Sequence, residues 1–425
     1  MNRAFVRRAA SCVLLLASAS SGALAQEEWF RDWDSARRAA QAGRKPMVVE
    51  FQAVWCYSCY YMEKVLAGPA FAQAAQGMTL LKLDVDKPEG RALRDKYRAR
   101  ALPTFVIVDP AGKELGRIVG EQTQKDFLAQ LSRAAGRPRD QGLERLQAAL
   151  DRSDLAAASR ERDRLRPGKA GASAEFRTLS ARTELLLAAK DKKAAAAARA
   201  FADLLGLEEG CALAYDVEEA FGPLSALEAA PRRALLLDAA ARLETLVEKR
   251  VLGPKEERCA DARTAVASLC DVYEALGEKG KEDALEDRVL AMLRTEASKE
   301  GAGADRNLDD NLRFFLEKAG RQAELDELYP RLIAAYPADY VYAYRYSKNL
   351  LERKEYGRAL PYAEKGVQLG YGANRLNAVS VKARILSGLG RKAEALQLLR
   401  SELKAARGRF QKEASGLEEA LRAIR

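Results

Sequence analysis

The spacing of hydrophobic residues between positions 28 and 135 predicts alternating helices and strands. A β-branched apolar run at 48–54 stops at a pair of cysteines, and later apolar runs of strand length are separated by helical stretches. The predicted elements are a helix within 29–42 starting near Asp34 or Ser35, a strand within 48–54, a helix from Cys59 toward Gly68, a strand at 78–85, a helix at 91–97, a strand hairpin at 104–108 and 114–119, and a helix at 124–135. After the first helix, the βαβαββα order of these elements predicts an α/β domain at 26–135.

Beyond residue 135 the strand-like runs disappear and helical spacing continues to the end of the chain. Alanine, leucine, glutamate and lysine dominate, and glycine or Pro-Gly recurs roughly every 15–40 residues. Alanine has the highest helix propensity and allows helices to pack closely, so its abundance indicates structure and not chemistry. We therefore expect an all-α array of helical hairpins.

A repeat with spacings of 34 and then 36 residues runs through the last third of the chain. The aligned apolar positions are Leu316, Leu350 and Leu386, then Leu325, Ala359 and Ala395, and then Tyr329, Ala363 and Leu399. This pattern resembles tetratricopeptide repeats, which stack helical hairpins of about 34 residues around a concave face. Arg313 stands where the later units carry the small residues Ser347 and Ala383, so the first unit is degenerate. We predict hairpins at 136–305, TPR-like repeats at 306–402 and a capping helix at 403–425.

The first 25 residues have the pattern of a secretory signal peptide. Three arginines precede an apolar run at 13–17, and small residues lead to Ala25. The apolar run is too short to cross a bilayer, which takes about 20 residues, and no later stretch is long and uncharged enough. We predict cleavage near Ala25, a periplasmic or secreted location, and no integral membrane segment in the mature chain.

Charge and composition argue against two classes of function, nucleic-acid binding and histidine-dependent hydrolysis. The formal charge of the 425 residues is +10, and removing the three arginines and no acids of the signal leaves +7. Acidic and basic residues are interspersed, which is typical of a solvated helical surface and not of nucleic-acid binding. The chain has no histidine, which excludes the Cys-His and Ser-His pairs of many hydrolases.

The cysteines Cys56 and Cys59 form a Cys-x-x-Cys pair where the apolar strand gives way to a helix. A helix N-terminus stabilises a thiolate on the first cysteine, so Cys56 is the candidate nucleophile. The alternative is half of a zinc site, but zinc needs about four ligands and the chain offers neither a second such pair nor a histidine. We therefore expect redox chemistry and no metal, and no cofactor either, since the reacting sulfurs carry the electrons.

These residues resemble the thioredoxin superfamily. Trp55 precedes the cysteine pair, the run 102–105 resembles the cis-proline loop with Pro103, and Gly120 matches the glycine after the last strand. Among its members, the resemblance is greatest to the C-terminal thioredoxin-like domain of the DsbD disulfide-interchange proteins, whose leading strand resembles 45–48. It covers residues 28–135.

The resemblance also implies roles for an acid and a base. Glu50 matches the buried acid beneath the disulfide, where burial would raise its pKa and let it exchange a proton with Cys59. Lys82 would tune Glu50, and Pro103 would lie against the disulfide. The alternatives are an exposed strand glutamate and an ordinary surface lysine. The chain departs from the usual pattern in carrying Glu for Asp at position 50 and Tyr57-Ser58 for Gly-Pro.

The other cysteines of the mature chain are Cys211, Cys259 and Cys270. If Cys259 and Cys270 share one helix, eleven residues separate them by about 16 Å, which is beyond the roughly 7 Å limit for a disulfide. Either could instead reach Cys211, as export makes a structural disulfide plausible. The alternative, equally supported, is that all three are small buried hydrophobic residues.

The combined prediction is an exported thiol-disulfide oxidoreductase that reduces protein disulfides, with helical repeats that select its partner. Its partners would be disulfide-bearing exported proteins and an upstream thiol electron donor. Because Tyr57-Ser58 carries no positive charge that would stabilise the Cys56 thiolate, the Cys56–Cys59 pair should have a low reduction potential and act as a reductant. The alternative function is a non-catalytic TPR scaffold that carries a thioredoxin-like docking domain.

Overall fold

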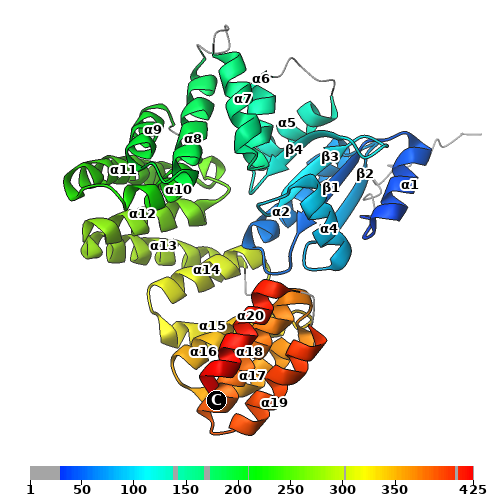
Figure 1. The fold of residues 1–425 in the computed structure, drawn as a ribbon, viewed down its shortest axis with the longest axis vertical. Helices are drawn as coiled ribbons and strands as arrows, with labels where there is room; N and C mark the ends of the chain where they lie inside the picture. Colours follow the sequence, from blue (N-terminus) through cyan, green and yellow to red (C-terminus); the bar gives the residue numbers. More distant parts are fainter. Residues whose placement is uncertain are drawn as a thin grey trace, which may run out of the picture.

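The computed structural model describes residues 29–136, 142–166, 173–208, 210–300, 303–406 and 410–424. Figure 1 shows an α/β domain beside an all-helical array, which starts next to β4 (Glu114–Val119) and curves around one side of that domain. The predicted α/β class followed by helices is confirmed. The predicted signal peptide at 1–25 lies outside the described residues.

A four-stranded sheet forms the centre of the α/β domain. Its strands are β1 (Met47–Gln52), β2 (Thr79–Asp84), β3 (Thr104–Val108) and β4 (Glu114–Val119). The order across the sheet is β2-β1-β3-β4, with β1 parallel to β2 and the other pairs antiparallel. Because β1 is central and covered on both faces, its sequence is a nearly continuous apolar run.

Five helices cover the two faces of this sheet, namely α1 (Trp33–Gly43), α2 (Tyr57–Ala67), α3 (Pro69–Ala74), α4 (Pro88–Tyr97) and α5 (Gln124–Ala135). α1 and α4 pack around Trp33 and Tyr97 on one face, and α2, α3 and α5 pack around Phe71 and Phe127 on the other. Asp34 and Ser35 lie in the first turn of α1, as expected, and the side chain of Asp32 accepts the amide of Ser35 and caps the helix. α3, which begins with a proline, was not predicted.

The remaining described helices form the array. They are α6 (Gly142–Asp151), α7 (Leu155–Leu165), α8 (Ala174–Lys190), α9 (Ala194–Leu207), α10 (Leu213–Leu224), α11 (Ala229–Arg250), α12 (Ala262–Leu276), α13 (Lys279–Glu300), α14 (Arg306–Lys318), α15 (Gln322–Ala335), α16 (Val341–Glu352), α17 (Tyr356–Leu369), α18 (Gly372–Gly388), α19 (Lys392–Ala405) and α20 (Gln411–Ile424). One apolar core continues from α8 to α18. Within the described chain, no helix has the length and apolar character needed to cross a membrane.

The three aligned sets of repeat positions are buried at matching places in consecutive helix pairs. Leu316, Leu350 and Leu386 lie near the ends of α14, α16 and α18, and the other two sets lie on α15, α17 and α19. This arrangement is consistent with a helical repeat array. Arg313 is buried at the position where the later units carry Ser347 and Ala383.

The structure decides how the three remaining cysteines are arranged. Cys211 and Cys259 form a disulfide with Cα atoms 5.8 Å apart, and Cys270 is a free, buried thiol. Cys259 precedes α12 and Cys270 lies within it, so the two do not share one helix. The interpretation of all three as isolated buried residues is therefore wrong for Cys211 and Cys259.

The Cys211–Cys259 disulfide closes a loop with a sequence separation of 48. We expect the double variant Cys211→Ser/Cys259→Ser to lower the unfolding free energy of the array by about 4 kcal/mol, because the unfolded chain regains loop entropy. Urea unfolding followed by circular dichroism measures this change. Adding reductant should lower the urea midpoint of the wild type to that of the variant. If the two proteins unfold at the same urea concentration without reductant, the prediction is contradicted.

Candidate functional site

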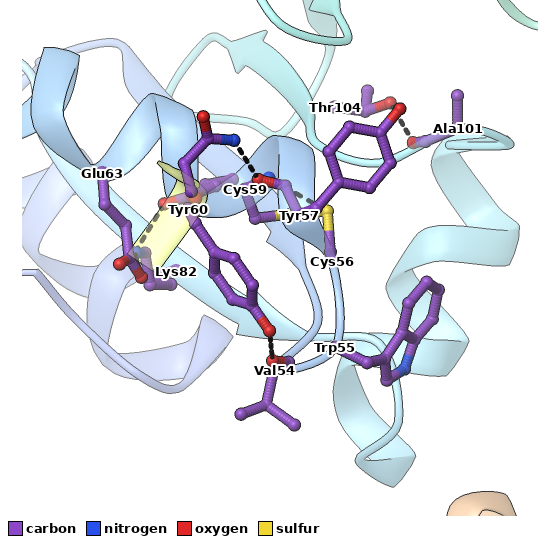
Figure 2. The surroundings of a disulfide bond; sticks show 12 residues. Val54, Trp55, Cys56, Tyr57, Cys59, Tyr60, Glu63, Lys82, Ala101 and Thr104 are labelled. Carbon is purple, nitrogen blue, oxygen red and sulfur yellow. Dashed lines mark hydrogen bonds and ion pairs between the residues drawn. A yellow bond between two sulfur atoms is a disulfide. The ribbon is translucent and has the colours of Figure 1, made fainter. Parts of the chain in front are cut away.

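Cys56 and Cys59 lie at the start of α2, directly after the central strand. Cys56 caps the helix, and its Sγ accepts the backbone amide of Cys59 at 3.1 Å. The two cysteines form a disulfide with Cα atoms 5.2 Å apart (Figure 2). They are only 4 % and 2 % exposed. The predicted strand-turn-helix placement is confirmed, and it puts the first sulfur where the helix dipole stabilises a thiolate.

The loop before β3 carries the cis proline. The Leu102–Pro103 peptide bond is cis, as the resemblance implied. Gly120 donates its amide to the carbonyl oxygen of Pro103 at 2.8 Å, and its φ of 76° is a conformation that favours glycine. Trp55 is 37 % exposed, and its indole Nε1 donates to Asp86 at 2.7 Å.

Glu50 and Lys82 face each other across neighbouring strands. They are register partners in β1 and β2, and Lys82 Nζ lies 3.3 Å from Glu50 Oε2. Glu50 is 0 % exposed, and neither of its carboxylate oxygens accepts a hydrogen bond within the described chain. Burial raises the pKa of Glu50 to about 7, although the charge of Lys82 opposes this rise. The alternative of an exposed strand glutamate is therefore wrong.

The array contacts the dipeptide between the two cysteines, which the sequence did not indicate. The guanidinium of Arg263, on α12, lies 3.8 Å from the centre of the Tyr57 ring. The Tyr57 hydroxyl donates to Asp261 at 3.3 Å, and Asn307 of α14 donates to the Tyr57 carbonyl at 3.0 Å. Arg345 of α16 donates to the carbonyl of Trp55 at 3.2 Å. Three array helices therefore reach the two residues that flank Cys56.

Further contacts extend this interface along the same edge of the α/β domain. Lys64 of α2 pairs with Asp305, and the guanidinium of Arg306 lies 4.1 Å from the centre of the Tyr60 ring. At the loop after β2, Tyr371 donates to Asp84 at 2.6 Å. Asn374 donates to Asp86 at 2.8 Å. The array thus covers the α2 side of the cysteine pair.

A second cluster, away from the cysteine pair, could offer metal ligands. One ligand atom from each of Cys270, Glu282 and Glu286 lies within 4.8 Å of the others, and all three residues are buried. Lys318 Nζ lies 3.4 Å from Glu282 and supplies positive charge there. Burial raises the pKa of the Cys270 thiol to about 12. Three ligands are one fewer than structural zinc usually has.

Comparisons with known proteins agree with this geometry. A family model described as thioredoxin-like matches residues 28–110. The chain is 32 % identical over 97 residues to a thioredoxin H-type of Oryza sativa subsp. indica, an alignment that covers 23 % of this chain and 74 % of that protein. The chain belongs to the thioredoxin superfamily.

Two further similarities concern the same part of the chain. The thiol:disulfide interchange protein DsbD of Ralstonia nicotianae is 36 % identical over 107 residues, which are 24 % of this chain and 18 % of that protein. The chain therefore spans about a fifth of the length of this relative. The solution structure of a Thermus thermophilus thioredoxin is 31 % identical and covers 25 % of this chain and 85 % of its own, with a TM-score of 0.24.

The fold, the relatives and the Cys56–Cys59 pair together support thiol-disulfide oxidoreductase chemistry. Of the residues expected at the site, Trp55 directly precedes the cysteine pair, Glu50 and Lys82 pair across β1 and β2, and Pro103 lies in the loop before β3. The array residues were missed because they lie about 200–290 positions along the chain from α2.

The raised pKa of Glu50 predicts a pH-dependent stability. The folded chain keeps a proton on this carboxyl between pH 4.5, its ordinary value, and about 7, whereas the unfolded chain releases it. This contribution to stability is complete below pH 4.5 and is lost as the pH rises through 7. Glu50→Gln lacks the titration, so its unfolding free energy should rise relative to wild type by about 3 kcal/mol between pH 4 and pH 8.

Urea unfolding of both proteins across this pH range measures the difference. Glu63→Gln is the matched control, because Glu63 also lies near Lys82, at 3.8 Å, but its side chain is exposed. A difference between wild type and Glu50→Gln that stays constant with pH would contradict the assignment.

Proposed function

We propose that this protein is an exported thiol-disulfide oxidoreductase that reduces disulfides in other exported proteins. The observation that supports it most directly is the Cys56–Cys59 disulfide at the start of α2, in a domain that also carries the cis Pro103 and the buried Glu50. The signal-like sequence at 1–25 supports export, with cleavage near Ala25 and a periplasmic location.

In the proposed reaction the Cys56 thiolate attacks one sulfur of a client disulfide. The client S–S bond breaks, its electron pair leaves with the second client sulfur, and that sulfur takes up a proton. Cys59 then attacks Cys56 Sγ and releases the first client sulfur, so the client gains two electrons and Cys56–Cys59 becomes a disulfide. Glu50 accepts the proton of Cys59, a role that suits a buried carboxyl with a pKa of about 7.

The direction we propose is reduction, with an upstream thiol carrier returning two electrons to Cys56 and Cys59. The Tyr57-Ser58 dipeptide carries no charge of its own, in contrast to a cationic residue that would stabilise the thiolate from within the motif. Lys82 acts on Glu50 in this scheme, and the exposed Trp55 contributes to the surface that receives the client.

The array, in our proposal, selects the client. Residues 136–305 form irregular hairpins, 306–402 form TPR-like repeats, and 403–425 cap them. Because α12, α14 and α16 contact the residues flanking Cys56, a client that reaches this sulfur also meets the array. The same coverage of α2 is the observation that favours the second candidate, a scaffold whose thioredoxin-like domain serves for docking.

A trapping experiment tests the proposed roles of the two cysteines. Cys59→Ser should accumulate mixed disulfides with clients through Cys56, because the thiolate that would release the client is absent. Non-reducing electrophoresis and mass spectrometry of the exported fraction identify these adducts. Cys56→Ser should reduce insulin no faster than the added reductant alone.

The control for trapping is the double variant Cys56→Ser/Cys59→Ser, which should carry no adducts. Insulin reduction at the background rate by the wild type, together with no adducts on Cys59→Ser, would favour the docking scaffold. Adducts on Cys270 with none on Cys56 would overturn the assigned site.

The proposed direction predicts a reduction potential nearer to the value of thioredoxin, about −270 mV, than to that of the oxidant DsbA, about −120 mV. Equilibration with glutathione buffers of defined ratio, followed by alkylation of the free thiols and mass spectrometry, measures the Cys56–Cys59 couple. A value close to that of DsbA would indicate an oxidant.

A further inference from the structure

The array brings two guanidinium groups to the residues on either side of Cys56. Arg345 Nη2 lies 3.2 Å from the carbonyl oxygen of Trp55, and the guanidinium of Arg263 lies over the Tyr57 ring at 3.8 Å. Both arginines come from helices far along the chain, α16 and α12. Their positive charges therefore reach a motif that has none of its own.

Both arginines are held by one carboxylate, Asp310 of α14. Asp310 accepts from Arg345 Nη1 at 2.5 Å and from Arg263 Nη2 at 2.9 Å, and Arg313 donates to it at 3.0 Å. Burial alone would raise the pKa of Asp310, but the three guanidinium groups hold it below its usual range. Glu317 pairs with Arg313 at 2.6 Å. Three cations and two anions leave one positive charge in excess.

The distance from Arg345 to the reacting sulfur can be bounded by covalent geometry. Standard bond lengths place the Cα of Cys56 about 2.8 Å from the Trp55 oxygen and Sγ about 2.8 Å from that Cα. Arg345 Nη2 is therefore within about 9 Å of Cys56 Sγ, which is shorter than the screening length of about 10 Å at 0.1 M salt. Cys56 is nearly buried, so water screens this interaction weakly.

Other charged or titratable groups also lie around Cys56. The groups on the elements packed against it are Glu50 on β1, Lys82 on β2, Asp86 after β2, Glu121 after β4, and Asp261 and Arg263 at the start of α12. Asp86 and Asp261 would disfavour a thiolate on Cys56. The positive charges of the arginines offset the effect of these two carboxylates on the Cys56 thiolate. A variant that removes one guanidinium therefore isolates the contribution of that arginine to the pKa of Cys56.

We propose that Arg345, held in place by Asp310, is a positioning residue for disulfide exchange that stabilises the thiolate form of Cys56. This inference rests on the proposed oxidoreductase function and assigns part of it to the array. The negative charge appears on Cys56 Sγ when a thiolate attacks the sulfur bonded to Cys56 and Cys56 leaves with the electron pair, and it disappears when the Cys56 thiolate attacks a client disulfide. Arg345 therefore favours the reduced form of the pair and makes the couple more oxidising than it would be otherwise.

The test is the pH dependence of Cys56 alkylation by iodoacetamide in the reduced full chain, followed on the Cys56 peptide by mass spectrometry. Arg345→Gln should raise the apparent pKa of Cys56 by about one unit, since a unit charge at this distance corresponds to about a tenfold change in ionisation. The glutathione-equilibrated potential should fall by about 30 mV, which is the same tenfold change for two electrons. Arg345→Lys should restore most of both shifts.

Two controls separate charge from structure. Asn307→Ala removes a hydrogen bond of the same interface, to the carbonyl of Tyr57, without removing a charge. Arg353→Gln removes a guanidinium at the end of α16 that binds Asp326 instead. Neither should move the apparent pKa of Cys56. A merely structural role for Arg345 would change the alkylation rate equally at all pH values.

An unchanged pKa in Arg345→Gln, or an equal shift in Asn307→Ala, would overturn the proposal. If Arg345→Gln does not fold, Arg263→Gln removes the second guanidinium and carries the same expectation. Failure of the proposed function is a separate result, because a wild type that exchanges no disulfide with any client would still show the titration of Cys56 and its shift.

Discussion

The buried carboxylate of Asp310 is the interaction on which the relation between the two parts of the molecule depends. An isolated ionised carboxylate is costly to bury, and it is tolerated here because three guanidinium groups surround it. Removing one partner of such a group typically costs about 3–5 kcal/mol, so the cluster holds α12, α14 and α16 in one arrangement. Because Arg263 and Arg345 also contact the residues flanking Cys56, that arrangement fixes the surroundings of the cysteine pair.

The thioredoxin-like part could be predicted from the sequence because its signals are local. The strands at 104–108 and 114–119 and the helix at 124–135 match the structure, since alternating or continuous apolar runs and turn residues specify them directly. The helix after Gly68 was missed because Pro69 reads as a break, although proline is well suited to the first turn of a helix.

The interface could not be predicted, because its contacts join residues about 200–290 positions apart and no periodic pattern links them. One local signal did point to it. Arg313 breaks the repeat pattern at a position where the next two units carry Ser347 and Ala383, and the structure shows that this arginine is buried against Asp310. The degenerate first unit thus carries a buried ion pair, because Asp310 lies three residues before Arg313 on the same helix.

The placement of the array also bears on how a repeat scaffold and a redox domain can cooperate. Joined by a flexible linker, the two parts would bind a client independently, and the array would raise only the local concentration of that client. Here α14 packs on α2 and α18 contacts the loop after β2, so the array is part of the wall around the cysteines. Trp55 remains exposed, and its indole donates to Asp86, which also accepts from Asn374 of α18. The exposed surface next to Cys56 therefore combines residues of both parts.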